Sequence, residues 1–105
     1  MKPFDIFIAY ISWGSEGKNR PVLVLVLGSE SVFGYPITTK YQHKSKAIRA
    51  RYYRIKDWAQ AGLDRESYID TGTMLSLPPS TIADKKSIGT LTIADKNELI
   101  AFIST

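Results

Sequence analysis

The residues from Lys40 to Lys56 form a stretch rich in basic and aromatic side chains, which are the types that bind phosphates and bases. It carries seven lysine and arginine side chains and no acidic one, and the rings of Tyr41, His43, Tyr52 and Tyr53 lie between the cations. Cations bind phosphates and flat rings stack on bases, so the pattern is typical of a surface for single-stranded nucleic acid. The alternative is a solvated loop and an edge strand that its charges protect from aggregation.

Counts of the metal-binding and nucleophilic residue types exclude several kinds of site. Cysteine is absent and histidine occurs once, at His43. The chain therefore has no disulfide, no thiol nucleophile and no zinc site built from cysteine or from several histidines.

Size and composition predict a single folded domain spanning residues 1–105. The chain has 44% hydrophobic and 23% charged residues, close to the globular average. Its longest apolar run, Val22 to Leu27, is far shorter than the roughly 20 residues of a membrane helix, and the N-terminus shows no signal-peptide pattern. We therefore expect a soluble protein, and the lack of cysteine is compatible with the cytoplasm. The net charge of +4 comes from residues 1–57, which hold ten basic and four acidic side chains.

Two strands are predicted that need burial on both faces. Asp5 to Ile11 and Val22 to Leu27 each place apolar side chains on both sides of a strand, as in sheets covered on both faces. A small closed barrel or a homodimer would provide that burial. Between them, polar Ser12 to Arg20 contains Gly14 and Gly17, which predicts a loop.

Two further strands are expected in the basic half of the chain. The first runs from Val32 to Thr39, where Pro36 implies an edge, a strand start or a bulge. The second is predicted from the alternation between Ile48 and Ile55, which would show Arg49 and Arg51 on one face.

The second half predicts short elements and one helix. Asp57 to Ala61 reads as one helical turn ended by Gly62, followed by short strands at Ser67 to Thr71 and Thr73 to Leu77. Thr92 begins a C-terminal helix with Asp95 in the acidic position of a capping box. Its predicted apolar stripe comprises Ile93, Leu99, Ile100 and Ile103. Together the elements predict a mostly β fold, a small, strongly bent barrel closed by a helix.

Three segments carry a resemblance to a known family. The first runs from Phe4 to Leu25 and contains Asn19-Arg20-Pro21-Val22-Leu23-Val24-Leu25; the second is Tyr35-Pro36-Ile37-Thr38-Thr39. The third joins Asp57-Trp58-Ala59-Gln60-Ala61-Gly62-Leu63 to Ser67-Tyr68-Ile69-Asp70, and Gly89-Thr90-Leu91 before the last helix also fits. In this order and spacing they resemble the MazF/PemK toxins of bacterial type II toxin-antitoxin systems, in a PemK-like branch.

The resemblance implies an SH3-like barrel that forms a homodimer. Such a protein cleaves single-stranded RNA at short sequences without a metal or other cofactor, and a protein antitoxin covers its active site. The family's catalytic arginine corresponds to Arg20 and its catalytic threonine to Thr38.

RNA cleavage of this kind uses the ribose 2′-hydroxyl as the nucleophile, so the protein must stabilise a negatively charged phosphorane. The guanidinium of Arg20 offers a planar fork of donors for phosphate oxygens, and the hydroxyl of Thr38 adds one more. Because guanidinium stays protonated in proteins, charge stabilisation is its first role. Read without the resemblance, Arg20 is a surface charge and Thr38 an ordinary strand residue.

One part of the family pattern is missing. Where other members carry an acidic residue or glutamine and then an arginine, this chain reads Thr71-Gly72-Thr73-Met74-Leu75-Ser76. Loss of a general base typically lowers a rate by about 10²–10⁴-fold. Asp70, a strand step away, is a third expected catalytic residue. His43 is another candidate, because histidine is the side chain type whose unperturbed pKa lies near neutrality.

The family's glycine-containing loop flanks the RNA, and the indole of Trp13 in the matching segment could stack on a base or simply fold back over the barrel. The expected RNA-binding residues are Trp13, Ser15, Glu16, Lys18, Thr39, Lys40, His43, Arg49 and Arg51.

Three functions stay open at this point. The first is a toxin endoribonuclease. The second is a catalytically weak or inactive relative that binds RNA or regulates. The third is a protein-interaction barrel that ignores nucleic acid.

Overall fold

The computed structural model describes residues 1–83 and 85–105, and the side chain of Trp13 lies outside the described part. Its strands are β1 (Asp5–Trp13), β2 (Glu16–Leu27), β3 (Val32–Thr38), β4 (Tyr52–Arg54), β5 (Tyr68–Asp70), β6 (Leu75–Leu77) and β7 (Gly89–Thr90). Its helices are α1 (Lys46–Arg49), the 3₁₀ helix η1 (Pro79–Thr81) and α2 (Ile93–Ile103).

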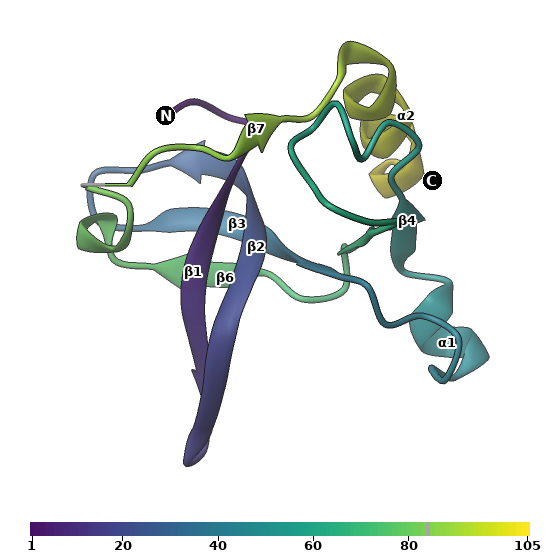
Figure 1. The fold of residues 1–105 in the computed structure, drawn as a ribbon, viewed down its shortest axis with the longest axis horizontal. Helices are drawn as coiled ribbons and strands as arrows, with labels where there is room; N and C mark the ends of the chain where they lie inside the picture. Colours follow the sequence, from purple (N-terminus) through teal and green to yellow (C-terminus); the bar gives the residue numbers. More distant parts are fainter. Residues whose placement is uncertain (84) are drawn as a thin grey trace.

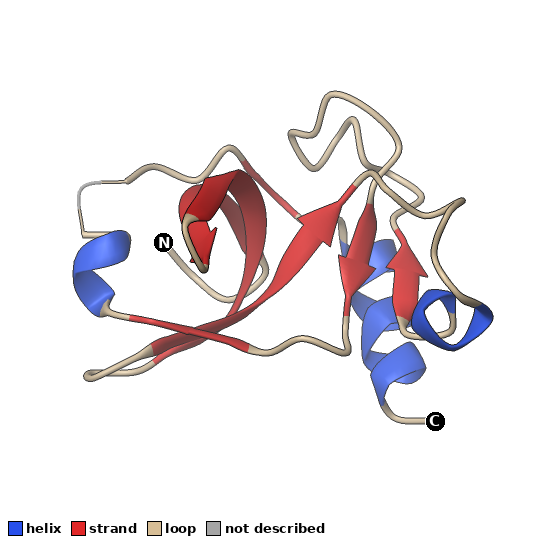
Figure 2. Ribbon diagram, turned by 90° about the horizontal axis from the view of Figure 1, so that it is seen from below, coloured by secondary structure: helices blue, strands red, loops and turns tan. Residues whose placement is uncertain are grey.

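The described strands form one curled antiparallel sheet in the order β4-β5-β3-β2-β1-β7, with β6 paired to β3. Figure 1 shows the long β1 and β2 crossing the molecule, with α2 beside β4. Figure 2 places η1 at one end of the sheet and α1 and α2 at the other. This mostly β, strongly bent sheet with a C-terminal helix confirms the expected fold class.

Both faces of β1 and β2 are buried within one chain. Ile6 and Leu23 belong to a cluster that includes Leu99 of α2, whereas Phe7 and Val22 belong to a second cluster on the opposite face. The two-faced apolar pattern is therefore explained by the curl of the sheet and its covering segments, and it does not require a dimer.

The prediction of a loop from Ser12 to Arg20 is wrong. β1 and β2 remain paired from Ala9 opposite Arg20 to Trp13 opposite Glu16, and only two residues form the turn. Gly14 has φ +59°, the left-handed conformation that tight hairpin turns require. The segment is polar because the hairpin extends into solvent beyond the barrel (Figure 1), so polarity marked exposure here and not the end of a strand.

β3 is confirmed close to its predicted bounds, and its proline occupies a gap. β6 pairs with β3 from Val32 to Gly34, and β5 pairs with Ile37 and Thr38. On this edge of β3, Pro36 falls between the β5 and β6 ladders, so its missing N–H interrupts neither; on the other edge it lies opposite Val22 of β2.

The fourth strand is much shorter than predicted. Ser45 caps α1 by accepting a hydrogen bond from the Ile48 N–H at 3.2 Å, and β4 begins only at Tyr52. Local capping therefore decides the structure of residues 45–49. Arg49 and Arg51 do not share a strand face.

The predicted turn after Asp57 forms and is held by two glycines. The Ala61 N–H donates to the Asp57 carbonyl at 3.1 Å, and Gly62 ends the turn at φ +94°. A Cβ at Gly62 would collide with the Ile88 carbonyl, and one at Gly89 with the Ala61 carbonyl. Backbone therefore packs directly on backbone where this turn meets β7.

α2 begins as predicted but buries a different face. Thr92 caps it by accepting from the Asp95 N–H, yet Ile93 is 78% exposed and Ile100 and Ile103 are also exposed. Of the predicted stripe only Leu99 is buried. The inward face also carries Asp95, fully buried, because its carboxylate accepts hydrogen bonds from the Tyr53 hydroxyl at 2.6 Å and from two backbone N–H groups, of Lys56 and Asp57.

None of the described helices is both long and apolar enough to cross a membrane.

Candidate functional site

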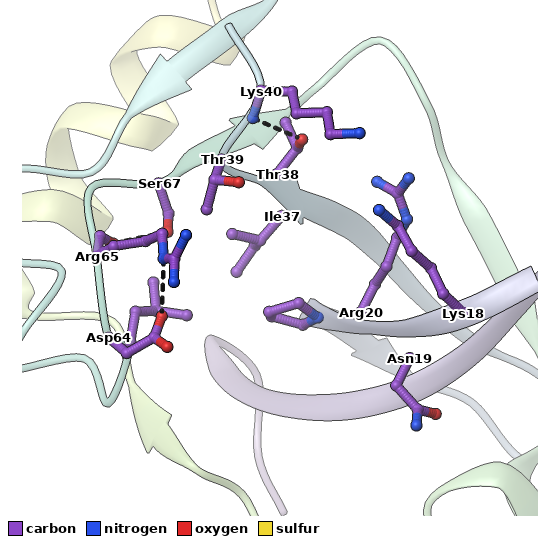
Figure 3. A pocket seen from close by; sticks show the side chains of 12 residues that line it. Lys18, Asn19, Arg20, Ile37, Thr38, Thr39, Lys40, Asp64, Arg65 and Ser67 are labelled. Atoms are coloured by element: carbon purple, nitrogen blue, oxygen red, sulfur yellow. Dashed lines mark hydrogen bonds and ion pairs between the residues drawn. The ribbon is translucent and has the colours of Figure 1, made fainter.

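A pocket of about 260 Å³ opens where β2, the end of β3 and the segment before β5 meet. Figure 3 shows cations on one wall, an acid-base pair on the other and Ile37 between them. The lining residues are Lys18, Asn19, Arg20, Pro21, Ile37, Thr38, Thr39, Lys40, Leu63, Asp64, Arg65 and Ser67. The pocket thus brings together Arg20 and Thr38, which the sequence places far apart.

Strand register sets the cationic wall. Lys18 and Arg20 are two apart on β2, so their side chains project on the same face, and they extend side by side in Figure 3. Arg20 is half-buried, with its Nε shielded from solvent. Lys40, just past the end of β3, directs its ammonium group toward the same region.

The ammonium group of Lys18 is affected by the two neighbouring cations. Arg20 foremost, and Lys40 to a lesser extent, lower the pKa of Lys18 through charge repulsion. Like charges gathered at one place create a positive potential that an anion would relieve. The wall is therefore suited to a phosphate or another small anionic group.

Thr38 closes β3 at the edge of the pocket. Its Oγ1 accepts a hydrogen bond from the Lys40 N–H at 3.1 Å. A hydroxyl that accepts through its oxygen can still donate its own hydrogen, so Thr38 can offer a donor to an anion in the pocket while holding the turn to Lys40.

Asp70 faces a different hollow. A second pocket, of about 210 Å³, is lined by Ile11, Arg20, Pro36, Asp70, Thr73 and Leu75. The Asp70 carboxylate accepts hydrogen bonds from the Gly72 N–H at 2.9 Å and the Thr73 hydroxyl at 2.8 Å. Arg20 borders both pockets, so Asp70 lies near Arg20 but outside the pocket that contains Thr38.

Tyr52 lies directly opposite Asp70 in the β4–β5 pair. Burial raises the pKa of Tyr52, the Asp70 carboxylate raises it further, and the Arg20 guanidinium opposes that rise. The Tyr52 hydroxyl consequently remains protonated at neutral pH.

The opposite wall was missed by the sequence analysis. Arg65 and Asp64 form an exposed ion pair of 3.7 Å, and the buried Ser67 donates to the Arg65 carbonyl at 2.9 Å. Ser67 belongs to the third segment of the resemblance, and Asp64 and Arg65 lie between its two parts, but no pattern in the sequence placed them beside Arg20. The other unpredicted lining residues are Asn19, Pro21, Ile37 and Leu63.

The remaining predicted RNA-binding residues are distributed along the surface. Ser15 and Glu16 are exposed at the hairpin tip and line neither pocket beside Arg20, while Thr39 lines the first of them. The stacking predicted for the Trp13 indole falls outside the described part. His43 lines a separate hollow next to Thr39.

Arg49 and Arg51 take different places. The Arg49 guanidinium lies over the ring of Tyr41, 5.6 Å from its centroid. Arg51 is exposed, and its carbonyl accepts two hydrogen bonds from Thr71, from the N–H at 3.0 Å and from the hydroxyl at 2.6 Å. Arg51 therefore anchors the turn after Asp70 through its backbone.

Comparison with known proteins identifies a fold. No protein-family model and no curated protein matches the chain. Among solved structures it is similar to the Mycobacterium tuberculosis toxin MazF-mt6, with a TM-score of 0.70 and 24% sequence identity over 95% of this chain and 92% of that one. The chain therefore has the fold of a MazF toxin.

Proposed function

We propose that this protein is a toxin endoribonuclease that cleaves single-stranded RNA at specific short sequences, without a metal, through the 2′-hydroxyl of the substrate. The supporting observation is that Arg20 and Thr38 line one pocket together with Lys18 and Lys40. The fold shared with MazF-mt6 and the resemblance of three segments support the same function.

The proposed reaction needs charge stabilisation more than a protein nucleophile. The 2′-oxygen forms a bond to phosphorus while the bond to the 5′-oxygen breaks, leaving a cyclic phosphate and a 5′-hydroxyl. One proton leaves the 2′-oxygen and one is delivered to the 5′-oxygen. Arg20 donates a fork of hydrogen bonds to the phosphorane oxygens, Thr38 donates one more, and Lys18 and Lys40 add positive charge. Donors fixed in place before the reaction are effective because they need no reorganisation.

A cleavage assay in EDTA tests this proposal. Wild-type protein should cut mixed-sequence single-stranded RNA to products with 5′-hydroxyl ends. Arg20→Ala should lose at least about 10²-fold in rate, the usual cost of removing one oxyanion donor. The matched control is Arg54→Ala, because Arg54 lies outside both pockets beside Arg20 and pairs with Glu66 on the surface at 3.3 Å.

A second candidate function is RNA binding without turnover. It is favoured by Asp70, which lines a different pocket from Thr38 and accepts hydrogen bonds within its own turn, and by the missing acidic or glutamine and arginine positions. Binding of RNA with no 5′-hydroxyl product at any protein concentration would select this alternative.

The assembly and location follow from the proposed activity. We expect a homodimer, a protein antitoxin that covers the pocket at Arg20, and action in the cytoplasm, where RNA is available. Light scattering of the purified protein measures its mass in solution and so tests for the homodimer. Loss of RNA cleavage in the presence of a co-purified partner protein tests for the antitoxin.

A further inference from the structure

A third hollow, separate from the one that contains Asp70, adjoins the pocket lined by Arg20 and Thr38. It has a volume of about 440 Å³ and is lined by six consecutive residues, Thr39 to Lys44. Thr39 and Lys40 also line the first pocket. A ligand that reaches across these two shared residues would occupy both hollows with neighbouring groups.

Tyr41 in this hollow is held by a second ring. Its ring stacks on that of Tyr68, with centroids 4.3 Å apart and planes 7° from parallel. Tyr68 is buried, and its hydroxyl donates to Glu66 at 2.8 Å. Because Tyr68 is fixed in β5, Tyr41 is a preorganised flat surface and not a mobile loop side chain.

Arg49 also lies over the ring of Tyr41. Its guanidinium carbon is 5.6 Å from the centroid of that ring, and Tyr68 stacks on one face of it. A planar group between ring and guanidinium needs two contact separations of about 3.5 Å each, or about 7 Å in all. Arg49 sits at the end of the short α1, and a small movement of its flexible side chain would open that space.

Charge indicates which planar group fits. Lys40 and Lys44 line the hollow, Arg49 lies above Tyr41, and residues 40–56 contain no acid. A nucleotide fits both the flat ring and the positive charge, since its base stacks on Tyr41 and its phosphate lies near Lys40.

We propose that Tyr41 and Arg49 form a base-stacking subsite for single-stranded RNA. It receives the base of a nucleotide next to the phosphate held at Lys18, Arg20 and Lys40, and it rests on the proposed RNA-directed function. Tyr41 is thus a binding residue that places the strand across the first pocket.

Binding without cleavage tests the subsite. The probes are two 2′-O-methyl octamers that cannot supply a 2′-hydroxyl nucleophile, one a mixed-sequence pool with all bases and one an abasic strand of the same phosphate count. The proteins are wild type, Tyr41→Leu, Tyr41→Phe and, as a matched control on an exposed tyrosine of the hairpin, Tyr10→Leu. Thermal unfolding checks that each variant is folded.

Tyr41→Leu should bind the base-containing strand about 5- to 150-fold more weakly, the range for one stacked base. The abasic strand should bind all four proteins equally, because its contacts are to phosphate. Tyr41→Phe and Tyr10→Leu should match wild type. Equal affinity of Tyr41→Leu and wild type for the base-containing strand would overturn the subsite while leaving RNA binding intact. Failure of both strands to bind wild type would instead remove the proposed function, and the subsite with it.

Discussion

At the scale of single residues, Arg20 occupies the boundary between two hollows. One contains Thr38 and the lysines, and the other contains Asp70. A guanidinium with several donors can serve both sides at once, so Arg20 can bind a phosphate on the Thr38 side while its position is influenced from the Asp70 side. Asp70 shares a pocket with Arg20 and not with Thr38, so we expect any catalytic role of Asp70 to act on the Arg20 side.

The hydroxyl of Thr38 gives a sharp test at this scale. Thr38→Val keeps the shape and removes the donor, so single-turnover cleavage should slow by about 10²-fold, the lower cost of one lost oxyanion donor. Thr38→Ser should retain most of the rate because it keeps the hydroxyl. Equal rates for the valine and serine variants would show that the hydroxyl does not take part.

At the scale of elements, the sequence predicted most strands but not their lengths. β1 and the inner part of β2 were predicted because their apolar side chains alternate between two buried faces. The hairpin tip and α1 were missed, since a polar strand and a polar loop look alike when neither is buried. The inward face of α2 was also missed, because Asp95 is buried only through partners on β4 and the following turn.

Asp95 makes the attachment of α2 depend on pH. Burial alone would raise the pKa of Asp95, but hydrogen bonds from the Tyr53 hydroxyl and from the Asp57 and Lys56 N–H groups outweigh it and leave the pKa below its ordinary 3.8. A lowered pKa in the folded state means that the unfolded chain binds the proton more readily. The stabilisation is therefore complete well above pH 3.8 and is lost as the pH falls through the folded-state value.

Urea unfolding between pH 2 and 7 measures this effect. Asp95→Asn should lower the free energy of unfolding at pH 7 by about 1.5–3 kcal/mol, the value of hydrogen bonds to a charged group. It should also flatten the decline of stability below pH 4. An unchanged acid slope in the asparagine variant would assign that decline to other groups, of which Asp5, also lowered in pKa, is the first.

The contact between Gly62 and Gly89 links β7 to the wall of the pocket, because Leu63 and Asp64 follow directly. Gly89→Ala should destabilise the protein by about 1–3 kcal/mol through overpacking, measured by thermal unfolding. Ser87→Ala, at a nearby exposed position, is the control. A fully stable Gly89→Ala protein would mean that the two backbones separate at little cost.

In the whole molecule, the curl of the sheet brings basic residues of the first half of the chain together at one pocket. Lys18 and Arg20 on β2 meet Lys40, just past the end of β3, at one pocket. Their convergence could not be read from the sequence, because it depends on the register of β2 against β3. The resemblance supplied Arg20 and Thr38, whereas Asp64, Arg65 and Ser67 emerged only from the fold.

Salt dependence tests the cationic wall. The logarithm of the RNA affinity should fall with the logarithm of salt concentration by about 0.7 per phosphate contact. Lys18→Gln should reduce that slope by about 0.7 if Lys18 contacts one phosphate, and Lys86→Gln, at an exposed site outside the pocket, should leave it unchanged. Equal slopes for the two variants would place the RNA elsewhere.

In the proposed reaction, Arg20 stabilises the phosphorane formed when a ribose 2′-oxygen attacks the adjacent phosphate. Single-turnover cleavage of one RNA, compared with the same RNA carrying a 2′-O-methyl group at the cut position, tests it most directly. We expect a cyclic phosphate and a 5′-hydroxyl from the unmodified RNA, no cut at the modified position, and a rate at least about 10²-fold lower for Arg20→Ala. Cutting at the methylated position, or an undiminished rate for Arg20→Ala, would contradict it.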